Sequence, residues 1–238
     1  ASGVVLVLLL AEIDLSVGAV SGFTAAVMAV LNVKQGWPGW LAILAALACG
    51  AVIGALQGFW VTRFRIPAFV VTLAGFLSWT GALLLVLGET GTVNLAAATI
   101  TGLTSTFFVA LDAWLLAVVV IAAYAGAKLW ERRKRAAAGL PVVPMQLLVI
   151  RIVVIAVALL ATAAVMATDR GLPLALVIFI ALVVLVDLLI NRTRFGRHVL
   201  AVGGNAEAAR RAGIRVDNVR LVVFTLASAL AAAGGIMA

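Results

Sequence analysis

Long apolar runs recur throughout this sequence, and they decide what the chain can fold into. A helix needs roughly 20 apolar residues to cross a bilayer, and the sequence holds about seven runs close to that length. Hydrophobic residues make up 66% of the chain. Soluble domains hold about 45–50%, so one aqueous core could not bury all of this apolar surface. The runs are 4–31, 41–61, 68–87, 108–127, 145–167, 174–190 and 221–238.

We therefore predict an all-α fold, a polytopic transmembrane helical bundle of about seven spans that forms a single domain over residues 1–238. The sequence starts at Ala1 rather than Met and stops inside an apolar run at Ala238. We expect the protein to continue, with more spans, beyond this segment. In the second run, Gly50, Gly54 and Gly58 recur at a helical spacing. This pattern predicts a face for close helix packing.

Basic residues gather in some connecting segments and are sparse in the others. They lie in the turn at 63–65, in a basic loop at 128–140 and in an arginine-rich loop at 191–220, whereas the alternate connections keep Lys34 and Arg170. Cytoplasmic loops of membrane proteins are rich in Lys and Arg, so we assign the first three segments to the cytoplasm. The net charge of +8 is then a loop charge and predicts no nucleic-acid partner. We expect the loop at 128–140 to be solvated, and to set topology or touch anionic lipid.

A short helix is predicted at the centre of the arginine-rich loop. Asn205 is a good N-cap, because its side chain can accept a hydrogen bond from a free backbone N–H. Glu207 follows in the first turn and Arg210 and Arg211 lie in the last turn, where each sign of charge suits the helix dipole. Gly213 can adopt the left-handed conformation that ends a helix. A helix this short is marginal alone, so we expect neighbouring spans or a partner protein to hold it.

A polar interruption, E-I-D-L-S-V-G at 12–18, divides the first apolar run. Carboxylates at membrane depth are costly and are functional-site candidates. The simpler interpretation, which we favour, is a helix break near one membrane face. In that case Asp14 and Ser16 cap the backbone groups that the break leaves free, and Leu15 and Gly18 complete the motif.

Signatures of catalysis or metal binding are missing from the sequence. Cys49 is the single cysteine and His198 the single histidine, so neither a disulfide nor a Cys/His metal site can form within this chain. No nucleophile-elbow pattern and no Walker motif occurs. We therefore predict no catalytic residue, no metal and no cofactor, and a protein that is not an enzyme.

The sequence resembles bacterial sugar ABC importer permeases of the ribose/xylose type in several stretches. The motif at 12–18 is similar to G-I-D-L-S-V-G of that family, and R-I-P-A-F-V-V-T-L at 65–73 is similar to one of its helix entries. T-R-F-G-R at 193–197, A-V-G-G-N-A-E-A-A-R at 201–210 and G-I at 213–214 are similar to its cytoplasmic loop T-R-F-G-R … A-I-G-G-N-x-E-A-A-R-x-x-G-I. This last match is long and specific.

The match is not complete, and it favours one branch of the family. Glu12 stands where the family usually has Gly. The basic loop at 128–140 and the spans that follow the loop at 88–107 are more similar to the xylose branch than to the ribose branch.

The resemblance implies the membrane-spanning permease subunit of an ATP-driven importer for monosaccharides, most directly a pentose such as xylose. It implies a multi-pass protein of the bacterial cytoplasmic (inner) membrane. The expected partners are separate ABC ATPase subunits that hydrolyse ATP, a periplasmic sugar-binding protein and a second permease subunit, giving a homodimer. The family's coupling helix, which docks on the ATPase, corresponds here to Gly203, Gly204, Asn205, Ala206, Glu207, Ala208, Ala209, Arg210 and Gly213.

Other functions stay open from the residues alone. A branched-chain amino-acid importer permease shares the wider fold and differs in its substrate. A stand-alone secondary transporter should carry more ionisable residues within its spans. An intramembrane enzyme should carry a nucleophile and a base.

Overall fold

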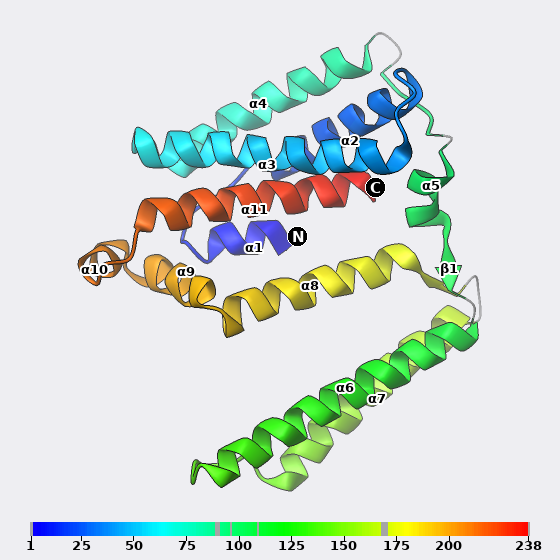
Figure 1. The fold of residues 1–238 in the computed structure, drawn as a ribbon, viewed down its shortest axis with the longest axis vertical. Coiled ribbons are helices and arrows are strands. Elements are labelled where there is room, and N and C mark those ends of the chain that lie inside the picture. Colours follow the sequence, from blue (N-terminus) through cyan, green and yellow to red (C-terminus); the bar gives the residue numbers. More distant parts are fainter. Residues whose placement is uncertain (1, 89–90, 96, 109, 168–170, 238) are drawn as a thin grey trace. The chain divides into compact units, whose positions relative to one another are not determined.

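The computed structural model describes residues 2–88, 91–95, 97–108, 110–167 and 171–237, and most of them are helical (Figure 1). Two-residue strands form one short antiparallel pair, in which Phe107 faces Pro173 and Phe108 faces Leu172. The elements in chain order are α1 (Ser2–Leu8), α2 (Val17–Val33), α3 (Gly39–Arg63), α4 (Ala68–Leu87), α5 (Ala98–Ser105), β1 (Phe107–Phe108), α6 (Ala110–Ala137), α7 (Met145–Ala167), β2 (Leu172–Pro173), α8 (Leu174–Arg192), α9 (Arg194–Gly204), α10 (Ala206–Arg211) and α11 (Val216–Ile236).

The predicted all-α membrane fold is confirmed. Among the described residues, 6 helices are long and apolar enough to cross a membrane: α3, α4, α6, α7, α8 and α11. Helix α2, also apolar, is shorter at 17 residues. Together these helices correspond to the seven apolar runs of the sequence.

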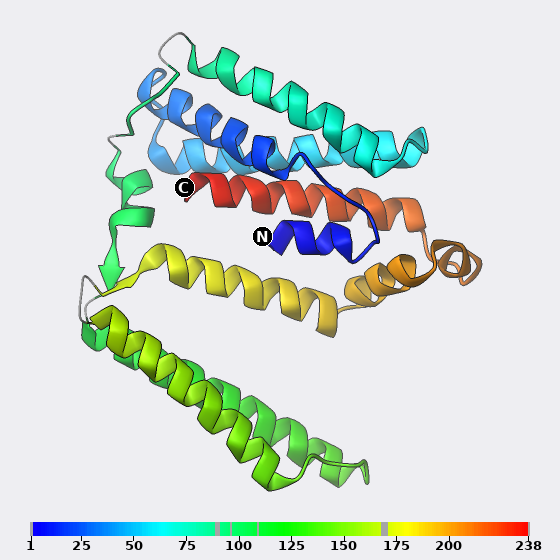
Figure 2. The same ribbon diagram turned by 180° about the vertical axis from the view of Figure 1, so that it is seen from behind.

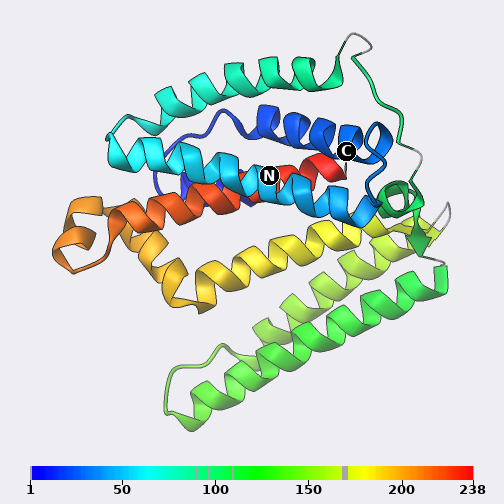
Figure 3. The same ribbon diagram turned by 45° about the horizontal axis from the view of Figure 1, so that its top comes forward.

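The chain forms two compact units. Unit 1 comprises Ala1–Thr104 and Ile178–Ala238, and unit 2 comprises Ser105–Val177. Unit 2 is built on the α6–α7 hairpin, whose helices lie side by side (Figure 3). The single domain expected over residues 1–238 stays a prediction.

Helix α11 lies at the centre of unit 1 and packs against α1, α2 and α3. The close approach of α3 uses the predicted glycine face: Gly58 lies against Leu221, Gly54 against Phe224, and Gly50 against Ser228 and Ala232. A Cβ atom on Gly50 would lie 2.6 Å from the Cβ atom of Ala232. Because these contacts run in opposite order along the two helices, α3 and α11 are antiparallel.

The apolar run at 4–31 is not one interrupted span, and this expectation was wrong. Gly3 lies against Ala227, whereas Gly235 lies against Ser21. Figure 2 shows that α1 and α2 run in opposite directions along α11, so the chain reverses between them. Ala11, with a φ of 58°, lies at the reversal. Neither Gly nor Pro marks the turn, which is why hydropathy alone placed both helices in a single span.

The basic loop expected at 128–140 is largely helical, because α6 continues to Ala137. Lys, Arg, Glu and Ala are all strong helix formers, and cations suit the last turn of a helix. The turn at 63–65 and the start of α11 lie at the same end of unit 1, because α3 and α11 are antiparallel. Lys34 lies at the other end, where its Nζ donates to the carbonyl oxygen of Leu87. Arg170 lies outside the described residues.

The glycine face generates a first prediction. Gly50→Ala should lower the stability of unit 1 by about 1–3 kcal/mol, because the new methyl group would overpack the α3–α11 contact. Gly81→Ala on α4 is the matched control, since a Cβ atom there would meet no heavy atom within 4 Å. Thermal unfolding of the full-length protein in detergent measures both. Equal unfolding temperatures for the two variants would show that the contact is not tight.

Candidate functional site

The non-helical segment between α1 and α2 carries a buried polar cluster. Asp14 is 8% exposed and Ser16 is fully buried. Oδ1 of Asp14 accepts hydrogen bonds from the backbone N of Ser16 at 2.8 Å and from its hydroxyl at 2.7 Å. The Ser16 hydroxyl in turn accepts from Nε2 of Gln57 on α3 at 3.0 Å. These bonds connect the break to α3.

A second contact connects the same segment to α4. The backbone N of Leu15 donates to the hydroxyl of Thr72 at 3.2 Å, and this hydroxyl lies 3.3 Å from the carbonyl oxygen of Ile13. Thr72 is fully buried. Non-helical backbone at membrane depth is tolerated where protein groups satisfy its hydrogen-bonding groups, and the Thr72 hydroxyl does so here.

The predicted caps of the break are thus half right. Asp14 caps a backbone N–H freed by the break, as expected. Ser16 does not, because it precedes α2 without a side-chain capping bond and directs its hydroxyl to Asp14 and Gln57. Leu15 is exposed, and a Cβ atom on Gly18 would meet no heavy atom within 4 Å. Nothing in the structure explains glycine at position 18.

Glu12 forms an ion pair with Arg220 near the start of α11. The Arg220 Nε and Glu12 Oε1 atoms lie 2.7 Å apart, with side chains 28% and 11% exposed. A buried carboxylate needs such a partner, because an unpaired charge removed from water is costly. The structure therefore accommodates Glu12 where the resembled family has Gly.

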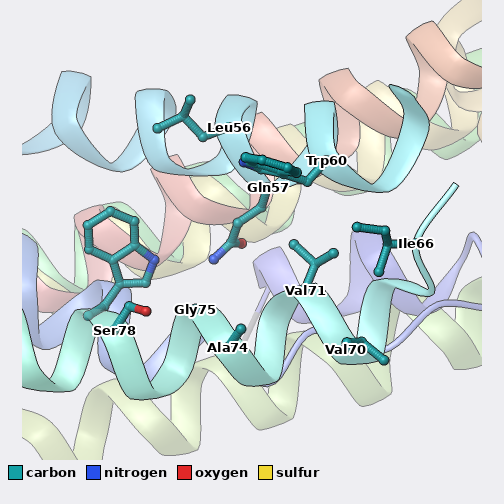
Figure 4. A pocket seen from close by; sticks show the side chains of 10 residues that line it. Leu56, Gln57, Trp60, Ile66, Val70, Val71, Ala74, Gly75 and Ser78 are labelled. Carbon is teal, nitrogen blue, oxygen red and sulfur yellow. The ribbon is translucent and has the colours of Figure 1, made fainter. Parts of the chain in front are cut away.

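A cavity of about 340 Å³ lies between α3 and α4. In Figure 4 the Gln57 side chain extends from α3 toward α4, below Trp60, and Ser78 and Val71 line the opposite wall. Gln57 therefore belongs both to the polar cluster and to the cavity wall. The remaining lining is mostly apolar, so the cavity offers few hydrogen bonds to a polar ligand.

The second candidate site is the arginine-rich segment, which is more ordered than a loop. Helix α9 was not predicted. The hydroxyl of Thr193 caps it by accepting from the backbone N of Gly196 at 3.1 Å, and Gly196 lies against the backbone of Ile190, where a side chain would not fit. A Thr followed by helix-compatible residues was a local signal for this cap. Gly203 and Gly204, expected in a loop, are the last residues of α9.

Helix α10 matches its prediction at each position. The Asn205 side chain accepts from the backbone N of Ala208 at 2.9 Å. Glu207 lies in the first turn, and Arg210 and Arg211 lie in the last. Gly213 has a φ of 84°, the left-handed conformation expected beyond the helix end.

Some residues of the predicted docking element are packed against the rest of unit 1, and others are exposed. Ala209 is 5% exposed, and it belongs to a core cluster that includes Val202 and Val216. Gly203 lies against the backbone of Leu9 and Leu10, where no side chain would fit. These residues attach the element to unit 1. The exposed members, which a partner could contact, are Gly204, Asn205, Glu207, Ala208, Arg210 and Gly213.

Ion pairs join α10 internally and to α11. Glu207 lies 3.2 Å from Arg211 and 3.6 Å from Arg210. Arg210 also lies 3.6 Å from Asp217, in the first turn of α11. Exposed pairs contribute only about 0.2–1 kcal/mol each, so they orient α10 more than they stabilise it.

In the part of the chain that the structure describes, no group of three or more His, Cys, Asp or Glu side chains is placed to hold a metal. His198 lines a surface cavity of about 470 Å³ beside Gly213 and Arg215. Cys49 is half-buried in α3.

Comparison with known proteins matches residues 1–238 to the permease component of branched-chain amino acid transport systems. The xylose transport system permease protein XylH of Escherichia coli (strain K12) is 33% identical over 237 residues, which are 100% of this chain and 60% of that protein. XylH of Haemophilus influenzae is 32% identical over 237 residues, which are 100% of this chain and 63% of that protein. The E. coli (strain K12) ribose import permease protein RbsC is 28% identical over an aligned stretch of 243 residues that covers 100% of this chain and 56% of that protein. The chain thus spans a little over half the length of these relatives. No solved structure matches it.

The break generates a second prediction. Thr72→Val should destabilise the protein by about 1–3 kcal/mol, because it leaves the backbone N of Leu15 without its partner. Thr80→Val is the matched control on the same helix, since the Thr80 hydroxyl donates within α4, to the carbonyl oxygen of Phe76. Thermal unfolding in detergent should separate the two. A control as destabilised as Thr72→Val would mean that loss of hydroxyl packing, and not the break, sets the cost.

Proposed function

Because the chain belongs to the family of permease components of branched-chain amino acid transport systems, we propose that it is part of the membrane-spanning subunit of an ATP-driven ABC importer for monosaccharides. The xylose transport permeases match the whole of this chain at 32–33% identity, which supports a pentose such as xylose as the substrate. Its spanning helices and its relatives make it a multi-pass protein of the bacterial inner membrane.

The proposed machine has several parts. Separate ABC ATPase subunits hydrolyse ATP, a periplasmic binding protein delivers the sugar, and a second copy of this permease completes the pathway. This chain carries no catalytic residue in the proposal. Its task is to change the packing of its membrane helices when the ATPase moves.

Helix α10 is the proposed docking element, and the observation that carries this proposal is its exposed, capped and anchored geometry. Ala209 and Gly203 fix it to the core, while Glu207, Ala208 and Arg210 remain exposed. Arg210 contacts Asp217 on α11, and Arg220 on the same helix contacts Glu12 in the break. A displacement of α10 would therefore reach α11 and the break through direct contacts, provided these helices have two packings of similar energy.

Co-purification tests the partner. The full-length protein, extracted in mild detergent, should retain a soluble ATPase, and a version with residues 205–213 scrambled should lose it. Retention by both versions would refute docking through α10. If no ATPase accompanies the intact protein, a stand-alone secondary transporter becomes the better proposal.

The family's description names a second substrate class, branched-chain amino acids. An uptake experiment decides between the sugar and the amino acid. The full-length protein is produced with its ATPase and binding protein in cells that lack their own importers. Labelled xylose should accumulate and labelled leucine should not. The opposite result would leave the importer proposal intact and change its substrate.

A third prediction concerns the charges of α10. Glu207→Lys and Arg210→Glu should each abolish ATP-driven uptake while the protein stays folded, because exposed substitutions change docking more than packing. The double variant keeps an opposite-charge pair at these positions, but the sign of the charge that a partner would contact is reversed at each of them. It should also be inactive. Restored uptake in the double variant would show that only the helix's internal ion pair matters, and normal uptake by both single variants would refute docking through these charges.

A further inference from the structure

The α6–α7 hairpin of unit 2 contains a cationic cavity that the proposed transport function does not use. The cavity has a volume of about 200 Å³. It lies near the end of α6 and the beginning of α7. Its charged lining residues are Lys128, Glu131, Arg132, Arg135 and Arg151.

The cations come from one face of α6. Lys128, Arg132 and Arg135 follow one another at the i, i+4, i+7 spacing, which places them on a common stripe. Tyr124, one turn earlier, also lines the cavity. Arg133 and Lys134 lie off this stripe, and Nζ of Lys134 lies instead 4.0 Å from the centre of the Trp130 ring. Lys128, Arg132 and Arg135 therefore line the cavity, whereas Arg133 and Lys134 lie on another side of the helix.

Arg151 adds a cation from within the apolar helix α7. It lies about 9 Å along the axis from Met145, at a rise of about 1.5 Å per residue. Its neighbours Leu147, Ile150 and Val154 are exposed apolar side chains, as expected for a surface that faces lipid. An Arg at such a depth normally faces a polar partner or extends to the head-group level.

The positive charge of this cavity is only partly compensated by protein. Lys128 pairs with Glu131 at 3.1 Å. No ion pair joins Arg132, Arg135 or Arg151 to any carboxylate within the described residues. The Nε atom of Arg132 is buried and has no hydrogen-bond partner there. The cavity thus brings several guanidinium donors together without carboxylate partners of their own in the described part of the chain.

We propose that this cavity binds the phosphate of an anionic phospholipid head group. Arg groups bind phosphate through charge-assisted hydrogen bonds, and basic pockets between membrane helices suit anionic lipid head groups. The exposed Trp130 and the apolar side chains around Arg151 place the cavity at a membrane interface, where Trp is enriched. A soluble anion would not use the apolar surroundings, whereas a phospholipid would cover them with its acyl chains.

Lipid titration of the full-length protein in detergent tests the proposal. Phosphatidylglycerol should bind and raise the unfolding temperature, whereas phosphatidylcholine and inorganic phosphate at equal concentration should do neither. Arg151→Gln should weaken phosphatidylglycerol binding by about tenfold, the scale of one lost charge-assisted contact. Arg133→Gln removes the same charge from α6 of the same hairpin, but outside the lining of this cavity, and it should bind normally. Native mass spectrometry measures the bound lipid independently of the unfolding temperature.

Several outcomes would overturn the proposal. Equal binding of phosphatidylcholine would mean that head-group charge is not recognised. Equal binding of inorganic phosphate would indicate a soluble anion, and tighter binding of a DNA oligonucleotide would indicate a nucleic acid. An equal loss in Arg133→Gln would indicate diffuse attraction rather than a cavity. If Arg151→Gln fails to fold, Arg135→Gln, at an exposed lining residue, should show the same loss.

Discussion

Residues 9–12 after α1 still donate their backbone N–H groups to carbonyl oxygens of α1, whereas residues 13–16 before α2 use side chains as hydrogen-bond partners. Much of unit 1 is arranged around this need for partners. A lipid-exposed segment of this kind would be very costly, so it must be enclosed by protein. Gln57 on α3, Thr72 on α4 and Arg220 on α11 each supply a polar side chain to it. The break consequently connects α3, α4 and α11 to one another through these side chains. The glycine face of α3 permits this convergence, because it lets α3 approach the central helix α11 closely.

Helix α11 links this enclosed segment to the exposed end of unit 1. Within its first turns it contacts α10 through Asp217 and the break through Arg220. The same helix contacts α1 and α3 along its small residues, so it cannot shift without repacking them. Close-packed interfaces tend to have discrete arrangements rather than continuous ones. A mechanism driven from α10 therefore does not need a long chain of contacts, because the single helix α11 contacts both α10 and the break.

The sequence predicts the features whose causes are local. Helix α10 was predicted at each position because caps such as Asn205 and Gly213 act within a few residues of the helix end. The reversal at Ala11 was missed, since a positive φ at Ala carries no sequence signal and hydropathy does not encode direction. The partners Gln57 and Thr72 were missed because each is an isolated polar residue between apolar neighbours, and each lies far from the break in the chain, 41 residues from Ser16 and 57 residues from Leu15. Arg151 was overlooked because its apolar surroundings matched a span.

The cations of this chain fall into two groups that differ in their partners. Around α10, Glu207 and Asp217 accompany Arg210 and Arg211, so the exposed surface is patterned in both signs. A patterned surface selects a partner by the arrangement of charges, as protein interfaces do. In the α6–α7 hairpin, Lys128 pairs with Glu131, whereas no ion pair joins Arg135 or Arg151 to a carboxylate among the described residues, so the charged lining of the cavity is mainly positive. A mainly positive cavity among apolar side chains suits the head group of an anionic lipid. The two groups of arginines therefore support the two different proposals, docking of a protein at α10 and binding of an anionic phospholipid at the hairpin.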